Sequence, residues 1–153
     1  MKLSTHFTVE EFTQSDTATR MGINNDLPVE LLATAKATAD MMERIRAYLS
    51  DRAASPIPIV VTSGYRCQQL NRAIGSSDSS DHIKALACDF RAPAFGSPLL
   101  VSKTLAPVMD VLGIGQLIYE HTWVHVSSRQ PDKRLNRLLT VRGKDYVIGI
   151  VEG

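Results

Sequence analysis

Two histidines and one aspartate form a set that could bind a metal ion. His82 and Asp89 are seven residues apart, which is too long a spacing for ligands on adjacent turns of one helix. The spacing suits a histidine on the loop entering a strand and an aspartate further along that strand. His125 lies in an apolar stretch, where an imidazole without a partner would cost free energy. Two imidazoles and one carboxylate are normal zinc ligands, and they leave a fourth position for water, as catalytic zinc sites do.

The alternative is that these histidines have only a structural role. A single histidine in a strand is more often a hydrogen-bonded residue of the core or the edge than a ligand. His6 and His121 are also available, and spacing alone does not exclude them. Zinc is the metal we expect on such N/O ligands, although other divalent ions bind similar sets.

Glu120 is the best candidate for the base that a metal-activated water requires. If His121 and Thr122 form a two-residue hairpin turn, Glu120 lies opposite Trp123. Glu120 and His125 then project to the same side as diagonal neighbours, about 7 Å apart. A solvated glutamate in a turn is the alternative interpretation.

A third element is Ser63-Gly64-Tyr65-Arg66, which follows a β-branched stretch. Gly64 would let the chain turn sharply, leaving Tyr65 and Arg66 at the end of the strand, where ligand-binding groups often lie. An arginine there could bind a substrate carboxylate through two parallel hydrogen bonds. Most arginines simply face water, so this signal is weak by itself.

Composition limits the class of protein. The chain has 153 residues, which suits a single domain over 1–153, and a formal net charge of +1. That charge provides no broad field for a polyanion, so nucleic acid is not an expected partner. The sequence predicts no signal peptide at the N-terminus and no membrane span. Cys67 and Cys88 match no redox motif; we expect two buried thiols, with one disulfide as the alternative.

Patterning predicts helices early and strands late, and therefore an α+β fold with a small, mainly antiparallel sheet flanked by helices. A capping box at Thr8 and Glu11 starts a short helix. Pro107 should kink or split a helix. The predicted helices cover 8–15, 28–49, 67–74 and 97–112; the predicted strands cover 59–63, 85–91, 116–120, 123–127, 138–142 and 146–151, with a polar loop over 75–82.

In order and spacing, several segments together resemble the zinc D-Ala-D-Ala carboxypeptidase and L-alanyl-D-glutamate endopeptidase family, which includes phage endolysins and shares its fold with the hedgehog signalling domain. The matching segments are LSTHFTVEEF, TATRMGINN, VTSGYRC..LN.AIG, S.H...A.ACDF and QLIYE..TWVHVS. The resemblance covers most of the chain.

The resemblance implies roles for particular residues. The family pattern S-x-H-x(6)-D falls on Ser80, His82 and Asp89, and the late metal histidine falls on His125. Arg66 falls on the arginine that helps to bind a substrate carboxylate. Ser80 is similar to the family's hydroxyl that contacts substrate or supports a metal ligand. We also expect Tyr65, the neighbour of Arg66 in the sequence, to contact substrate.

Two positions depart from the family pattern. Ala85 replaces a usual glycine, which should cost little because alanine is small. Thr122 stands where well-studied relatives have the catalytic acid, whereas Glu120 matches the phage-like branch. The resemblance thus implies a zinc peptidase that cuts an amide in peptidoglycan stem peptides, as an endopeptidase or a carboxypeptidase. Because no signal peptide is predicted, we expect a phage or prophage enzyme that is made in the cytoplasm and reaches the wall after release through a holin. We expect it to be a monomer. The alternative is a non-catalytic zinc-binding module of a phage particle or of wall binding.

Overall fold

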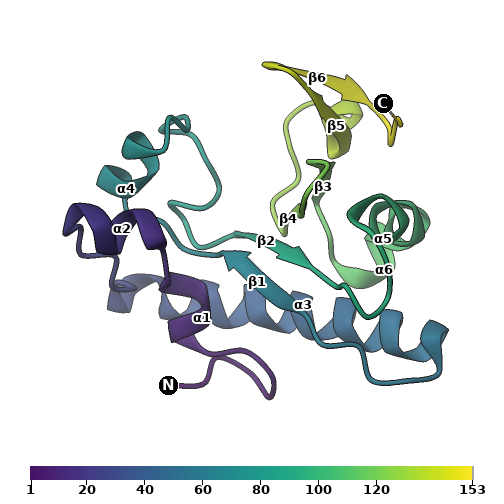
Figure 1. Ribbon diagram of the computed structural model, residues 1–153, viewed down its shortest axis with the longest axis horizontal. Helices are drawn as coiled ribbons and strands as arrows, with labels where there is room; N and C mark the ends of the chain where they lie inside the picture. The colour runs from purple at the N-terminus through teal and green to yellow at the C-terminus, as the bar shows by residue number, and fades with distance from the viewer. Residues whose placement is uncertain (153) are drawn as a thin grey trace.

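The computed structural model describes residues 1–152 and confirms the predicted α+β class (Figure 1). Helices occupy the first half and one flank, and most strands come later in the chain. The α-helices are α1 Val9–Thr13, α2 Asp16–Met21, α3 Leu32–Ala53, α4 Gln68–Ala73, α5 Pro98–Leu105 and α6 Met109–Leu112, and the short 3-10 turns are η1 Val29–Leu31, η2 Ala106–Val108 and η3 Arg134–Arg137.

Six strands form one sheet in the order β1-β2-β4-β3-β5-β6. Every neighbouring pair is antiparallel except β3 and β5, which run parallel. The sheet is therefore mainly antiparallel, as predicted, although the parallel pair was not foreseen. The strands are β1 Val60–Ser63, β2 Ala87–Arg91, β3 Gln116–Tyr119, β4 Val124–Ser127, β5 Leu138–Arg142 and β6 Asp145–Ile148.

The long helix α3 lies across the back of the sheet in Figure 1 and carries a buried stripe. Its buried apolar residues recur every three or four positions, which is the spacing of one helical face. The helix starts later than predicted because Pro28 is extended, at ψ 144°, and it continues to Ala53 before Ala54 ends it in the left-handed region. The stripe includes Ala35, Ala39, Met42, Ile45 and Leu49.

Local signals explain the short helices. The predicted capping box is present, since Thr8 Oγ1 accepts from the Glu11 amide and Glu11 reaches back to the Thr8 amide. Helix α2 was missed by the prediction, although Ser15 caps its start and Gly22 ends it at φ 65°. Pro107 splits the predicted fourth helix into α5 and α6, as expected.

The two faces of the sheet have different surroundings. Cys88 and Phe90 of β2, with Val124 and Val126 of β4, belong to the buried core. Because side chains alternate along a strand, Asp89 must point to the opposite face. One face is therefore covered by the core, and the other is free to carry polar groups.

The β3–β4 hairpin has the predicted register. Ile118 pairs with His125, and the Glu120 amide donates to the Trp123 carbonyl at 3.1 Å, which leaves a two-residue turn. The last hairpin is shifted from its prediction: β6 spans Asp145–Ile148, because Arg142 pairs with Asp145 across the turn.

Both cysteines are free, so the alternative of a disulfide is excluded in the structure. Cys88 is fully buried, whereas Cys67 is only partly buried and its sulfur accepts from the Leu70 amide at the start of α4. Among residues 1–152, no helix combines the length and apolarity needed to cross a bilayer.

Candidate active site

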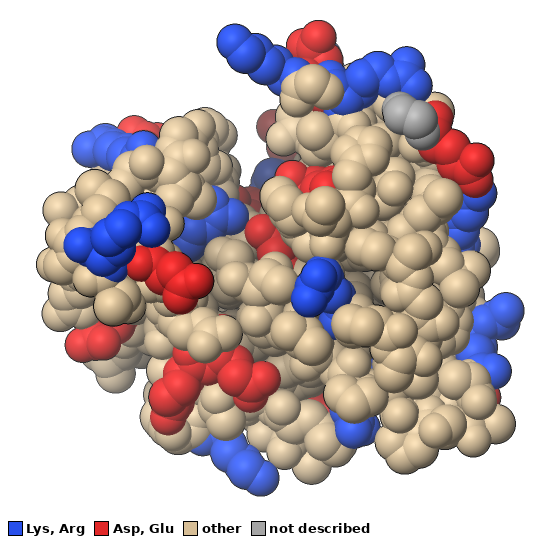
Figure 2. Space-filling view, viewed as in Figure 1, with Lys and Arg blue, Asp and Glu red and all other residues tan. Residues whose placement is uncertain are grey.

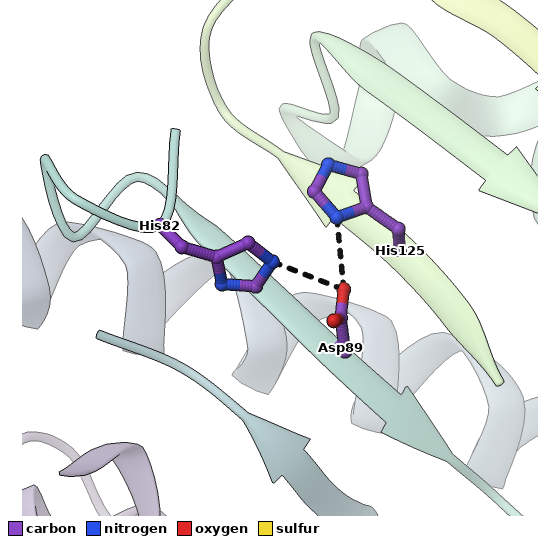
Figure 3. Close-up of side chains that lie close together, drawn as sticks. All are labelled: His82, Asp89 and His125. Carbon is purple, nitrogen blue, oxygen red and sulfur yellow. Dashed lines mark hydrogen bonds and ion pairs between the residues drawn. The ribbon is translucent and has the colours of Figure 1, made fainter. Parts of the chain in front are cut away.

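His82, Asp89 and His125 come together on the polar face of the sheet (Figure 3). One ligand atom from each lies within 4.8 Å of the others, and all three residues are buried. Asp89 and His125 are direct cross-strand partners on β2 and β4, so the backbone pairing itself sets their separation. His82 reaches the same point from the loop before β2, as the spacing had suggested.

The ring of His82 is fixed by a single strong contact. His82 Nδ1 lies 2.6 Å from the Gly64 carbonyl oxygen, and because a carbonyl only accepts, Nδ1 carries the hydrogen. The other nitrogen, Nε2, therefore has a lone pair. It is buried 3.3 Å from Asp89 Oδ1 but makes no hydrogen bond to any described residue. A buried lone pair oriented in this way is what a metal ligand supported by a backbone carbonyl requires.

His125 faces the same carboxylate. Its Nδ1 lies 2.8 Å from Asp89 Oδ1, so the two imidazoles converge on one oxygen (Figure 3). Two histidine nitrogens and a carboxylate oxygen are chemically suited to zinc. The geometry and the donor set thus fit a metal ion held by these three residues.

The charges of the group depend strongly on one another. Burial alone would raise the pKa of Asp89, but the charge of His82, together with the hydrogen bond and charge of His125, holds that pKa well below its usual range. Burial lowers the pKa of His82, which favours the neutral ring that binds metals. Burial also opposes charge on His125, yet the hydrogen bond and charge of Asp89 raise the pKa of His125 overall.

Gly64 is needed for a different reason from the expected one. Its φ is not in the left-handed region, so the turn itself does not require glycine. A Cβ at Gly64 would instead lie 2.7 Å from the Phe12 carbonyl oxygen and 2.8 Å from its Cα. Helix α1 therefore packs directly onto the residue whose carbonyl orients His82.

The turn between His82 and β2 is held by several contacts. Ser80 Oγ accepts from the His82 amide at 3.2 Å, so this hydroxyl supports a candidate ligand. Thr38 of α3 donates to the Ala85 carbonyl at 2.7 Å. Ala85 has φ 58°, which explains why relatives carry glycine here: the requirement concerns the backbone rather than side-chain size.

Asp81, next to His82, has partners for both oxygens. Arg129 Nε donates to Oδ1 at 2.6 Å, and Ser127 Oγ donates to Oδ2 at 2.8 Å. Ser127 is on β4, two residues after His125. These contacts tie the His82 turn to the strand that carries His125.

Glu120 lines the same cleft as the three metal-binding candidates. Trp123 Nε1 donates to Glu120 Oε2 at 3.0 Å, which fixes the carboxylate. Burial, and then the charge of Asp89, raise the pKa of Glu120, and His125 and Trp123 offset only part of that effect. A carboxylate with a raised pKa beside a metal-binding group is suited to proton transfer.

Arg66 also lines the cleft, although its side chain is mostly buried. Its Nη1 donates to Asn71 Oδ1 at 3.1 Å, and its Nη2 lies 3.7 Å from Asp89 Oδ2. Burial lowers the pKa of Arg66, while the charges of Asp89 and Glu120 act in the opposite direction. Its Nε has no hydrogen-bond partner among the described residues.

Three sequence candidates lie away from this group. Tyr65, which was expected to contact substrate, is only 6% exposed, packs in the hydrophobic core and is not among the residues that line the cleft. His6 binds Glu43 at 2.7 Å, and His121 sits in the exposed turn with Nε2 2.6 Å from the Val141 carbonyl. Their positions exclude both histidines from the metal group.

The site opens into a cleft of about 820 Å³. Figure 2 shows the surface hollowed between the part that carries α2 and α4 and the part that carries β5 and β6, with acidic atoms inside. The serine-rich loop from Gly75 to Ser80 lines one side. Tyr146 of β6 lines the cleft from the last hairpin.

Sequence reasoning missed several residues that build the site. Trp123 was assigned only to an apolar strand, although a tryptophan needs a partner for its N–H. Asn71, which is fully buried, holds Arg66 and also donates to the Ser77 carbonyl at 2.7 Å. A polar residue on an otherwise apolar helix face was the available signal.

Comparison with known proteins agrees with the geometry. No curated protein matches the chain. A family model described as Peptidase M15 matches residues 5–127, which include all three metal-binding candidates, Arg66 and Glu120. Members of this family are zinc peptidases. The chain belongs to the peptidase M15 family.

Proposed function

We propose that this protein is a zinc-dependent peptidase that hydrolyses an amide bond in the stem peptides of bacterial peptidoglycan. The observation that carries the proposal is the convergence of His82, Asp89 and His125 beneath a cleft that Glu120 also lines. Family membership supports a peptide substrate. Bound zinc would supply Lewis-acid chemistry, which polarises a carbonyl and acidifies water.

Glu120 is the proposed base, and afterwards the acid. Its Oε2 is held by Trp123, which leaves Oε1 free to accept a proton from water and deliver it to the leaving amine. Thr122, at the position of the usual acid in relatives, lies exposed in the turn and does not line the cleft. Glu120 is therefore the carboxylate that can serve in place of the relatives' catalytic acid.

Arg66 and Ser80 are the proposed substrate-binding groups. Arg66 is a cation that lines the cleft close to Asp89, and a peptide carboxylate could bind its guanidinium in place of solvent. Ser80 Oγ accepts a hydrogen bond from the His82 amide, so the hydroxyl hydrogen of Ser80 remains available to donate to a substrate carbonyl. Both roles suit an endopeptidase and a carboxypeptidase equally.

The wall as a target follows from the resemblance to the phage-endolysin branch. We propose that the chain acts as one catalytic unit and as a monomer, and that it reaches the wall after release through a holin. The competing proposal, a zinc-binding module without activity, gains its support from the threonine at position 122. The position of Glu120 in the cleft favours the enzyme.

The test is hydrolysis of purified peptidoglycan by zinc-loaded protein, followed as loss of turbidity with and without a chelator. Mass analysis of the fragments names the bond. Glu120→Ala should keep its zinc and lose at least about 100-fold in rate, whereas Glu30→Ala, which changes an exposed glutamate that does not line the cleft, should behave as wild type. A zinc-loaded wild type without hydrolysis would support the non-catalytic module instead, and a fully active Glu120→Ala would exclude Glu120 as the base.

A further inference from the structure

Tyr146 is an aromatic side chain that the chemistry described above does not use. It lies on β6, is 58% exposed, and lines the cleft that contains the zinc-binding candidates. Its segment follows residue 127, the last residue that the family model matches. The last hairpin therefore adds a wall to the cleft that lies outside the matched part of the chain.

The hairpin holds Tyr146 in a defined place. Tyr146 pairs with Val141 on β5, and β5 pairs in parallel with β3, the strand that leads into Glu120. Burial, and then the charges of Glu120 and Asp89, raise the pKa of the Tyr146 hydroxyl. Tyr146 lines the same cleft as Glu120 and Asp89, while much of its surface faces open space.

The remaining lining of the cleft differs in character. The serine-rich loop is held by Asn71, which donates to the Ser77 carbonyl, and by two hydrogen bonds from Arg72 to Asp78. Hydroxyl groups there can bond to a peptide backbone, whereas an aromatic ring offers apolar contact area at a small cost in side-chain entropy. A cleft of about 820 Å³ exceeds what one amino-acid residue fills, so a bound peptide would meet both linings.

We propose that Tyr146 binds the substrate: its ring packs against the aliphatic part of the peptide held in the cleft and so helps to set substrate preference. The proposal rests on the peptidase function proposed above. It assigns Tyr146 to binding rather than to bond cleavage, because the proton-transfer group is already provided by Glu120. The substrate class is an extended peptide with an apolar side chain or methylene stem next to the scissile bond.

Kinetics of a synthetic stem pentapeptide with zinc-loaded protein provide the test. Tyr146→Ala should raise KM by about five- to tenfold and change kcat by less than about twofold. Tyr146→Phe, which keeps the ring, should restore KM to near the wild-type value. Ile148→Ala is the matched control, because Ile148 is on the same strand and 59% exposed but borders a different surface groove. An unchanged KM in Tyr146→Ala, a loss confined to kcat, or an equal effect of Ile148→Ala would overturn the proposal.

A binding measurement separates this proposal from the function it rests on. Trp123 is the single tryptophan of the chain and lines the cleft, so its fluorescence reports ligand binding directly. In zinc-loaded Glu120→Ala, which should not cleave, adding Tyr146→Ala should weaken pentapeptide binding by about the same five- to tenfold. Hydrolysis by wild type with no such weakening would overturn only the role of Tyr146. Absence of hydrolysis by wild type would overturn the peptidase function itself.

Discussion

Asp81 and Asp89 are both buried, at 5% and 6% exposure, but their surroundings differ. The Asp81 carboxylate is bonded at both oxygens, by Arg129 and by Ser127, and these contacts join a turn to a strand. The Asp89 carboxylate receives two imidazoles at one oxygen, and one of those rings, His82, has a nitrogen without a hydrogen-bond partner among the described residues.

The comparison shows how a structural carboxylate can be told from a candidate metal-binding one. Both have the burial and the nearby donors that a search for charged clusters would detect. Only the group around Asp89 leaves a buried polar atom unpaired, and such an atom costs free energy that folding alone does not recover. The unpaired nitrogen, more than the burial, therefore points to a ligand.

The largest expected effect is that of Asp89→Asn. Removing the negative charge and one oxygen ligand should weaken zinc binding by more than about 100-fold and abolish hydrolysis. Zinc should raise the melting temperature of the wild type, because a ligand that binds only the folded state stabilises it, and should leave that of Asp89→Asn unchanged. Metal analysis and thermal unfolding check this outcome. Equal zinc content in the two proteins would remove Asp89 from the ligand set.

Asp81→Asn should show the opposite pattern. Breaking its bonds to Arg129 and Ser127 should lower the free energy of unfolding by about 1–3 kcal/mol, a range that allows for the part of Arg129 that faces solvent. Zinc affinity should fall by less than about tenfold, because loss of a group that is hydrogen-bonded directly to a metal ligand costs at least about tenfold. Asp81 makes no such bond to a ligand side chain. Urea unfolding and zinc titration measure both quantities. A large loss of zinc with unchanged stability would reverse the roles assigned to the two aspartates.

Glu120 is an intermediate case, with one oxygen held by Trp123. Trp123→Phe should keep zinc and lower kcat by about tenfold, because the carboxylate loses the donor that orients it. Tyr119→Phe removes a hydroxyl from the same hairpin, at a residue that does not line the cleft, and should leave kcat unchanged. Steady-state kinetics of both variants at the same zinc content measure the change in kcat. Equal losses in both variants would indicate general damage to the hairpin.

The smallest effect is expected at Ala85, in the turn that connects the two aspartates. Ala85→Gly removes the strain of an alanine in the left-handed region, which costs about 1–2 kcal/mol. The same change loses a buried methyl group and raises the conformational entropy of the unfolded chain, and both effects destabilise the folded state. The free energy of unfolding should therefore stay within about 1 kcal/mol of wild type. Ala54→Gly, also left-handed but exposed, loses no buried contact and should stabilise the protein more. Urea unfolding of both variants checks the order; the reverse order would mean that strain at Ala85 dominates.

Local patterns explain what the sequence could predict. The short turn before Trp123 and the period of two in its strands determined the hairpin register, so the side of the sheet shared by Glu120 and His125 followed. The proline at 107 likewise acts through its own backbone. These features depend on neighbours in the chain, which is why spacing was sufficient.

Features that depend on distant packing were not predictable. Tyr65 is buried in the core by residues far from it in the sequence, and Gly64 is required because it contacts Phe12 of α1. The parallel pairing of β3 with β5 joins segments separated by a long connection, and no local pattern specifies it. The last hairpin, and with it Tyr146, reaches the cleft only through that pairing.

The cross-strand pairing of Asp89 with His125 has a consequence for folding kinetics. The two residues face each other only after β2 and β4 have joined, which is a contact between distant parts of the chain. Zinc cannot bind its full ligand set before that step, so it cannot act as an early folding nucleus. Its stabilisation should instead appear in the unfolding rate, as slower escape from the native state.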